Sequence, residues 1–463
     1  MGDDRPARIS PVALLVGGAF FMELLDGSII NTALPQMALS FGVAAIDLNP
    51  GVSAYLLTVA VFILPSGWLA ERFGARPVFT AALALFTVSS VLCAICSSPA
   101  PFIAARMLQG VGGAMMVPVG RLVVLRTTAK PDLMRAIAVL TWPALTAPVL
   151  GPPLGGFIAG YLSWRWIFLL NVPLGVLGIA LAWRLVPPGR DAAQRPFDAL
   201  GFILGAAACL GLTLALEQLA AADDSSVRAA VLLVASAGLV AAFIRHMQRH
   251  PHPLVGLMPF QVPSFRVTLL GGSAMRVLIS TMPFLLPLLF QLGFGLDPFR
   301  GGLLVLTLFA GNIGIKPLTT PILRRWSFRT VLVCNGLLQA ACMAGCALLG
   351  PAVPDAVIVP LLVLAGASRS LQFTALNTLA FAEVPEAWLS TANTLFSLAF
   401  QFSVGMGVAV GAVALRAAGM TGAAPLPAFH GAFAGIALLM VGASLFGLLI
   451  RPDAAAAVAG RKA

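Results

Sequence analysis

Two carboxylates, Glu23 and Asp26, stand three residues apart in an apolar run, residues 12–34, that carries no other charge. On a helix, this spacing places both side chains on one face. An ionised carboxylate in the hydrocarbon of a bilayer costs at least about 2.5 kcal/mol, so we expect each one to face a partner or a water-filled cavity. A carboxyl group in such a place can take up and release a proton as its access to water changes.

A cation for this pair occurs in RMLQGVGGAMMVP, residues 106–118, where Arg106 and Gln109 lie about one helical turn apart. If the first apolar run crosses the membrane outward and this one crosses back, Asp26 and Arg106 both lie in the outer half. Their depths are compatible with direct contact or with a shared water-filled cavity. We therefore predict that Asp26 or Glu23 carries a proton and that Arg106 modulates it. A static buried pair, or side chains that reach the outer interface, is the alternative.

The composition excludes a soluble globular protein. Of the 463 residues, 59% are hydrophobic and 10% charged, and the mean hydropathy is +0.97, whereas soluble chains are about 25% charged. The first apolar run contains two acids and no small-residue cleavage site follows it, so we expect it to stay in the membrane. The net charge of +11 is spread over short loops without a continuous basic patch, which argues against nucleic acid as a partner.

Many segments are long and apolar enough to span a bilayer as helices, which takes about 17–25 residues each. There are fourteen of them: 12–34, 52–70, 77–96, 101–122, 136–160, 164–186, 199–220, 228–246, 266–291, 300–322, 329–350, 356–378, 390–416 and 429–450. With the N-terminus in the cytoplasm, 19 of the 28 Lys and Arg residues fall on the cytoplasmic side, 4 on the outer side and 5 within spans. This asymmetry predicts that both termini are cytoplasmic.

The fourteen segments divide into repeats. The loops after the second and tenth segments, GWLAERFGARPVFTAAL (67–83) and PILRRWSFRTVLVCN (321–335), both leave a helix through a basic turn and re-enter the membrane. We predict an all-α integral membrane protein with a six-helix half at 1–186, a linker and two inserted helices at 187–265, and a second six-helix half at 266–463. Repeated halves around a site near the bilayer midplane are typical of transporters.

Five motifs resemble those of the major facilitator superfamily, specifically its fourteen-span drug/proton antiporter branch of the QacA/EmrB type. They are LDGSIINTALP (25–35), GWLAERFGARP (67–77), RMLQGVGGAMMVP (106–118), APVLGPPLGG (147–156) and WRWIFLLNVPLG (164–175). Together with the span count, the resemblance covers essentially the whole chain. It implies the major facilitator fold and the export of small molecules in exchange for protons by alternating access.

The resemblance also implies roles for individual residues. Asn31 of the first motif and Gln109 of the third are expected to contact substrate. The residues expected to gate the pathway are Gly67, Glu71, Arg72 and Arg76 at the cytoplasmic face, and Gly151, Pro152 and Gly155 in a kinked fifth span. Glu71 stands where aspartate is usual and Ala75 where a basic residue is common. For the glycines and prolines, helix packing alone is the alternative to a direct role in transport.

Three further cations, Arg276, Lys316 and Arg369, lie inside the ninth, tenth and twelfth spans, which contain no acidic residue. Two carboxylates in one half and three cations in the other suit an anionic or zwitterionic solute better than a dicationic drug. A di- or tricarboxylate, alone or as a metal chelate, is therefore an alternative substrate, bound in a two-pronged fashion by the arginines. Each cation could instead latch a cytoplasmic loop.

Other classes of function lack the residues that they need. There is no G-x-x-x-x-G-K-[ST] loop for a nucleotide, and we expect neither an enzyme nor a cofactor. Three of the four histidines, His246, His250 and His252, fall in one cytoplasmic loop without a carboxylate partner, so we expect no metal site. The C-x-x-C pair Cys93 and Cys96 is interpreted as helix packing.

The leading hypothesis is a proton-coupled exporter in the bacterial cytoplasmic (inner) membrane. Its expected partners are a small-molecule substrate, protons and the lipid bilayer, and we expect a monomer. A channel or an uncoupled facilitator of the same fold is one alternative. It would need no titrating carboxylate, so the presence of Asp26, Glu23 and Arg106 disfavours it. A non-transporting scaffold or sensor is another, which the lack of an appended soluble domain disfavours.

Overall fold

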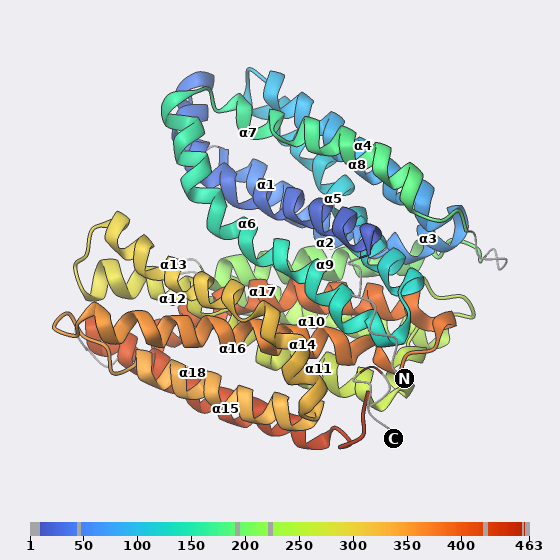
Figure 1. Ribbon diagram of the computed structural model, residues 1–463. Helices are drawn as coiled ribbons and strands as arrows, with labels where there is room; N and C mark the ends of the chain where they lie inside the picture. The colour runs from blue at the N-terminus through green and yellow to red at the C-terminus, as the bar shows by residue number, and fades with distance from the viewer. Residues whose placement is uncertain are drawn as a thin grey trace. The chain divides into compact units, whose positions relative to one another are not determined.

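The computed structural model describes residues 10–43, 48–189, 195–220, 226–419, 425–455 and 458, and within its helices the side chains of some residues, Asn31 and Pro152 among them, lie outside the described set. The chain divides into two compact units. The N-terminal unit is Met1–Phe62 with Ser66–Gln194, and the C-terminal unit is Ile63–Pro65 with Arg195–Ala463. Figure 1 shows the helices of both units.

The described part of the N-terminal unit is made of helices. They are α1 (Pro11–Phe41), α2 (Asn49–Phe62), α3 (Ser66–Phe73), α4 (Ala75–Ile95), α5 (Pro99–Thr127), α6 (Leu133–Tyr161), α7 (Arg165–Leu169) and α8 (Asn171–Leu185), with the short turn η2 (Lys130–Asp132) before α6. Within this unit α1 packs along α6, and α4 packs between α5 and α8 (Figure 1). The two carboxylates of α1 therefore belong to a bundle in which α5 also contacts α1 and α2.

Proline and glycine set the ends and bends of these helices. Pro11 begins α1, where its missing N–H leaves no hydrogen bond unmade. Gly42 ends α1 with a φ of +68°, and the next residue, Val43, donates its N–H to the carbonyl of Ala38 at 3.1 Å. Pro65 lies in the break between α2 and α3, which bend by 56°.

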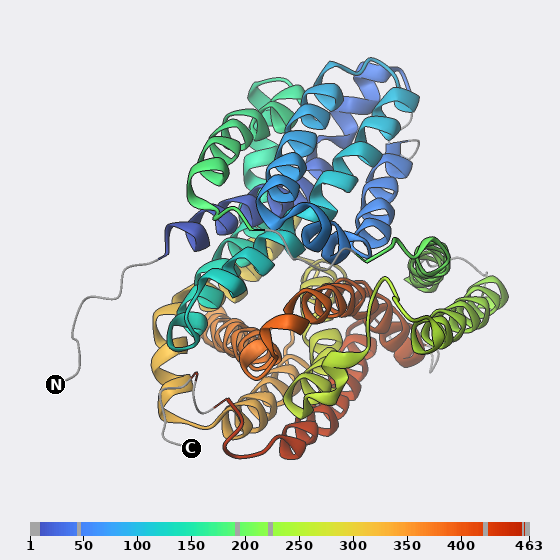
Figure 2. The ribbon, with the colours of Figure 1, turned by 90° about the vertical axis from the view of Figure 1, so that its right-hand side faces the viewer.

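The described part of the C-terminal unit is also helical. Its helices are α9 (Ala199–Ala220), α10 (Ser226–Arg249), α11 (Pro263–Ile279), α12 (Met282–Leu288), α13 (Pro298–Gly314), α14 (Lys316–Arg325), α15 (Phe328–Cys346), α16 (Asp355–Ala382), α17 (Leu389–Gly419) and α18 (Pro425–Leu445), joined by the short turns η3 (Met258–Gln261), η4 (Leu289–Gly293), η5 (Glu386–Trp388) and η6 (Phe446–Leu449). Figure 2 shows α9 and α10 (green) side by side. Within the C-terminal unit, α9 also packs against α17. The helices α9 and α10 lie on the segments 199–220 and 228–246, and their insertion between two six-helix halves stays a prediction.

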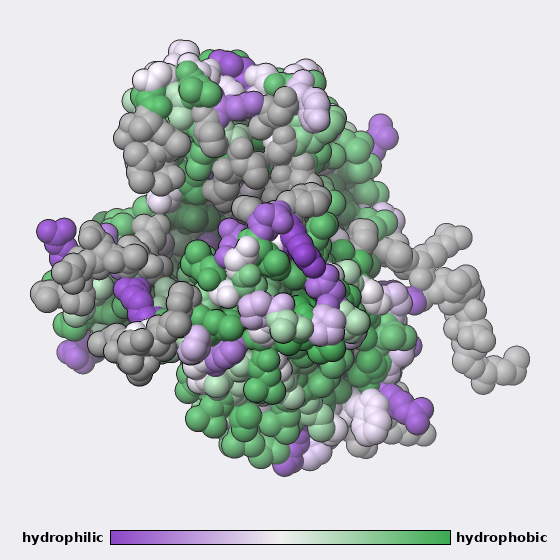
Figure 3. Space-filling view, turned by 90° about the vertical axis from the view of Figure 1, so that its left-hand side faces the viewer, coloured by the Kyte–Doolittle hydropathy of each residue, from purple (hydrophilic) through white to green (hydrophobic). Residues whose placement is uncertain are grey.

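Eleven helices among the described residues are long and apolar enough to cross a membrane, or thirteen spans if the bent pairs α2 with α3 and α13 with α14 each count once. The 29-residue α6 occupies the predicted fifth span, so helices lie on all fourteen predicted segments. Hydrophobic residues cover large areas of the surface in Figure 3. The predicted all-α membrane fold is confirmed, and the chain is a multi-pass membrane protein.

Candidate functional site

Asp26 lies inside the N-terminal unit, where it is 1% exposed. Its Oδ2 accepts a hydrogen bond from Nη1 of Arg106 at 2.6 Å, which makes a buried ion pair. Its Oδ1 accepts hydrogen bonds from Nε2 of Gln109 and from Nδ2 of Asn171, both at 2.9 Å. The structure thus brings Asp26 and Arg106 into direct contact, and three donors satisfy the buried carboxylate.

A hydroxyl group extends this network to α4. The Oγ of Ser90 accepts hydrogen bonds from Gln109 at 2.9 Å and from Asn171 at 3.2 Å. The Oε1 of Gln109 accepts a second hydrogen bond of Arg106 Nη1, at 2.6 Å. Each of these side chains is buried. Because α1, α4, α5 and α8 each contribute to the network, it links the four helices around one charge pair.

Glu23 lies beside this network in a different environment. It is partly exposed, and the hydroxyl group of Tyr55 on α2 donates to its Oε1 at 3.3 Å. The ring of Tyr55 also stacks against the guanidinium of Arg106, whose Cζ lies 4.2 Å from the ring centre. A Cβ at Gly113 of α5 would lie 3.1 Å from the Tyr55 hydroxyl group, so this glycine leaves room for the contact. Tyr55 therefore touches both charged groups.

The motif WRWIFLLNVPLG positions one member of the network. Trp164 and Phe168 are buried, and their rings meet Phe41 and Phe102 edge to face, with ring centres 5.4 and 5.9 Å apart. This aromatic core holds α7 against α1 and α5. Asn171, the first residue of α8, is thereby placed next to Asp26.

Three members of the network were not predicted from the sequence. Asn171 lies within a recognised motif, so a polar residue at the start of an apolar helix could have identified it. Tyr55 is one of only two tyrosines in the chain, which is a weak indication. Nothing distinguishes Ser90 from other serines. Gln109 hydrogen-bonds both members of the charge pair, and its expected contact with substrate stays a prediction.

The motif GWLAERFGARP makes cation–π contacts. Gly67, Glu71 and Arg72 lie on α3, and Arg76 is the second residue of α4. The guanidinium of Arg76 lies 4.3 Å from the ring centre of Trp183 on α8, and that of Arg72 lies 5.7 Å from the ring centre of Trp68. These contacts tie the loop to its own unit. The gating role of the motif stays a prediction.

The glycines of the fifth span bring α6 close to α1. A Cβ on Gly151 would collide with the hydroxyl group of Ser28. That hydroxyl group donates to the carbonyl of Ala147, one turn away on α6, at 3.3 Å. Gly155 is buried on the same helix, and the side chain of Pro152 lies outside the described residues. Gly151 therefore has a clear packing role, while the gating role stays a prediction.

The cations of the second half have partners within the C-terminal unit. Arg276 on α11 is fully buried, with its guanidinium 4.5 Å from the ring centre of Phe396 on α17. The Nζ of Lys316, at the start of α14, donates to Oγ1 of Thr374 on α16 at 3.0 Å. An aromatic ring and a hydroxyl group thus contact two of the three predicted anion-binding cations.

The third cation, Arg369 on α16, lies between two aromatic rings. Its guanidinium is 5.5 Å from the ring centre of Phe373 and 5.9 Å from that of Phe309. Substrate binding by Arg276, Lys316 and Arg369 stays a prediction. The side chain of Asn31, also expected to contact substrate, lies outside the described residues.

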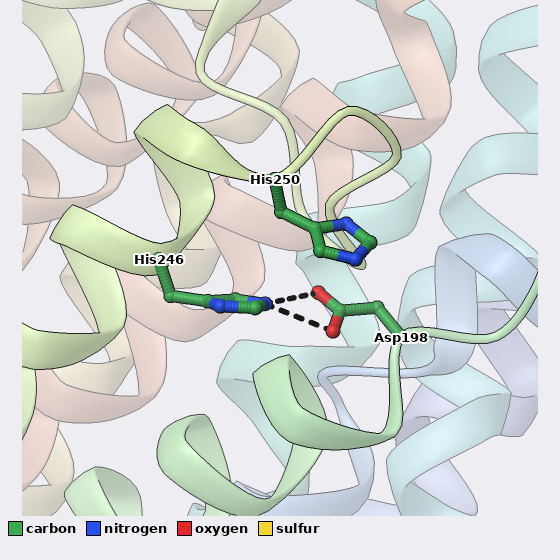
Figure 4. Close-up of side chains that lie close together, drawn as sticks. All are labelled: Asp198, His246 and His250. Atoms are coloured by element: carbon green, nitrogen blue, oxygen red, sulfur yellow. Dashed lines mark hydrogen bonds and ion pairs between the residues drawn. The ribbon is translucent and has the colours of Figure 1, made fainter.

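One expectation about the histidines was wrong. They were expected to lack a carboxylate partner, yet Nε2 of His246 lies 2.9 Å from both carboxylate oxygens of Asp198 (Figure 4). Asp198 is 48 residues away in the sequence. Only the pairing of α9 with α10 brings the two together, and no local pattern shows that.

Comparisons with known proteins agree with this architecture. A family model described as Major Facilitator Superfamily matches residues 16–409. A "Putative multidrug resistance protein MdtD" from Pectobacterium atrosepticum is 37% identical over 413 residues, which cover 89% of this chain and 88% of that protein. A protein of the same name from Salmonella newport is 38% identical over 405 residues, which cover 87% and 85%.

Two solved structures have a similar fold. The proton:xylose symporter XylE aligns with a TM-score of 0.65 and 14% identity, over 96% of this chain and 98% of its own. The human organic anion transporter MFSD10 aligns with a TM-score of 0.66 and 15% identity, over 94% and 98%. At such identities the likeness shows the fold alone. With a family model that spans most of its length and relatives above 35% identity, the chain belongs to the Major Facilitator Superfamily.

Proposed function

We propose that this chain is a proton-coupled exporter that moves small molecules out of the cytoplasm across the bacterial inner membrane by alternating access. Both termini lie in the cytoplasm in this proposal. The relatives are named for multidrug resistance, which supports a broad set of substrates. The observation that carries the proposal is the pair of carboxylates on α1, one buried against Arg106 and the other partly exposed.

Asp26 supplies a fixed negative charge in this mechanism. Its protonation would weaken the hydrogen bonds of three donors and leave the guanidinium of Arg106 buried without a counter-charge. Breaking a buried ion pair costs about 3–5 kcal/mol. The ion pair therefore favours an Asp26 that stays ionised while the transporter works, and that holds α1 and α5 together.

Glu23 carries the exchangeable proton. Its one described hydrogen bond comes from the neutral hydroxyl group of Tyr55, which can still donate to a protonated carboxyl group. Its side chain is less enclosed than that of Asp26, and in this proposal water reaches it when the pathway opens. Protonation removes a negative charge beside the stacked Tyr55 and Arg106. The protonation state of Glu23 therefore changes the electrostatic interactions between α1, α2 and α5. That change is what couples proton binding to conformation.

Drug export is favoured over export of an organic acid. The anionic alternative depended on three cations in spans without acids, and those cations now contact aromatic rings and a hydroxyl group. Such contacts lower the need for a carboxylate solute as a partner. The names of the relatives point the same way.

Purified protein in liposomes that contain a pH-sensitive dye tests this function. A lipophilic cation such as tetraphenylphosphonium, added on one side, should drive protons the other way through the wild-type protein. Glu386→Gln, which neutralises an exposed carboxylate in η5, should behave in the same way, whereas Glu23→Gln should move no protons. Proton movement with citrate alone, and none with a panel of cationic drugs, would support the organic-acid alternative instead.

A further inference from the structure

Asp198, His246 and His250 gather where α9 begins and α10 ends (Figure 4). The N–H of His250 donates to the carbonyl of His246 at 2.9 Å, so the helical turn continues to His250 and both imidazoles lie on one face. Asp198 comes directly before α9 and faces them from the other helix of the pair. One potential ligand atom of each residue lies within 4.8 Å of the others.

Asp198 is held in place by backbone groups. Its Oδ1 accepts the N–H of Gly201 at 2.8 Å, and its Oδ2 accepts the N–H of Leu254 at 3.1 Å. The side chain is 2% exposed, against 13% for His246. These bonds hold the carboxylate where its oxygens also meet the imidazole of His246.

The spacing of the three groups suits a small divalent metal ion. Nε2 of His246 lies 2.9 Å from both oxygens of Asp198, and two ligands of a tetrahedral ion with bonds of about 2.0–2.1 Å lie about 3.3 Å apart. The two imidazole rings are 4.9 Å apart between centres and inclined by 31°. Small side-chain movements would let all three atoms reach one ion.

Nδ1 of His250 accepts the N–H of His252 at 3.2 Å, in an exposed bend, so we assign Nε2 as the ring nitrogen that binds the ion. In Figure 4 the imidazole of His250 lies beside the carboxylate of Asp198. Binding through Nε2 moves the imidazole proton to Nδ1, so the contact with His252 is exchanged for a metal bond. That contact is exposed and weak, so losing it opposes binding little.

We propose that Asp198, His246 and His250 bind a divalent metal ion such as Zn²⁺ through one carboxylate oxygen and two imidazole nitrogens. Two imidazoles and one carboxylate are a ligand set that Zn²⁺ accepts, with a fourth position left for water. The ion joins the start of α9 to the end of α10 and so fastens the inserted helix pair. The three residues belong to the C-terminal unit, whereas the Asp26 network belongs to the N-terminal unit.

Zn²⁺ binding to the full-length protein tests this proposal. The protein is purified in detergent without a histidine tag, stripped with a chelator and titrated with Zn²⁺ against a chromophoric chelator. All variants carry Cys334→Ser, which removes an exposed thiol that could bind the ion. The wild-type site should bind one Zn²⁺ per chain, and His246→Gln and His250→Gln should each weaken binding at least about tenfold.

Two variants act as matched controls. His252→Gln changes the neighbouring exposed imidazole, and His430→Gln changes a histidine of α18 that bonds the carbonyl of Leu349; both should leave Zn²⁺ affinity unchanged. Zn²⁺ should also raise the unfolding temperature of these controls but not that of His250→Gln, which separates binding from misfolding. Equal Zn²⁺ affinity in wild type and His250→Gln, or no stoichiometric binding by the wild type, would overturn the proposal.

Discussion

Replacing Asp26 by asparagine should destabilise the protein far more than replacing Glu23 by glutamine. Asparagine keeps the shape of Asp26 but offers one acceptor oxygen where the carboxylate has two. Oδ2 accepts from Arg106, and Oδ1 accepts from Gln109 and Asn171. Whichever way the new amide turns, its NH₂ group faces a donor, and the guanidinium of Arg106 loses its counter-charge.

The size of the effect follows from these contacts. Removing one partner of a buried ion pair costs about 3–5 kcal/mol, so the free energy of unfolding of Asp26→Asn should fall by that amount. Glu23→Gln keeps an acceptor for the Tyr55 hydroxyl group, so its free energy of unfolding should fall by no more than about 1 kcal/mol. The double variant Asp26→Asn with Arg106→Gln should lose less free energy of unfolding than the two single variants lose together, because no buried charge is then left without a partner.

Unfolding by sodium dodecyl sulfate in mixed micelles, followed by the fluorescence of the seven tryptophans, measures these differences. Transport by Glu23→Gln and Asp26→Asn is recorded on the same preparations, to separate stability from coupling. If Asp26→Asn were as stable as Glu23→Gln, the carboxylate of Asp26 would not be a fixed member of the network, and the assignment of the two acids would have to be reversed.

Two further predictions concern packing and the tyrosine. Gly151→Ala should lower the free energy of unfolding by about 1–3 kcal/mol, because the new methyl group meets Ser28 across the α1–α6 contact. Gly18→Ala, in open space on α1, should be neutral or slightly stabilising. Thermal unfolding compares the two variants, and equal stabilities would contradict the packing argument. Tyr55→Phe keeps the ring over Arg106 but removes the hydroxyl group that donates to Glu23. It should lower the free energy of unfolding by about 1 kcal/mol in the same assay and alter the pH dependence of transport. An unchanged pH profile would contradict a link between Tyr55 and the proton.

The membrane fold was predictable because the bilayer imposes it. A span needs about 20 apolar residues, and the sequence shows such runs clearly. Its bends also have local causes: α13 and α14 bend by 49° where Pro317 follows the break. The pair Asp26 and Arg106 could be anticipated because each charge is costly in hydrocarbon without a partner.

The remaining contacts depend on how helices are rotated against one another, which hydropathy does not encode. Asn171 reaches both Asp26 and Ser90 only because α8 and α4 turn these polar residues toward the inside of the unit. Asp198 meets His246 only because α9 pairs with α10. In each case one polar residue in or beside an apolar helix resembles many others until its neighbours are known.

The central claim is that Glu23 exchanges the proton while Asp26 keeps its charge, and infrared difference spectroscopy tests it most directly. Substrate is added to purified wild-type protein and to each variant, and the absorption of protonated carboxyl groups is compared before and after. The proposal predicts a change in this absorption in wild type and in the exposed control Glu386→Gln, and its loss in Glu23→Gln. A change that persists in Glu23→Gln and vanishes in Asp26→Asn would show that Asp26 carries the proton and would contradict the mechanism.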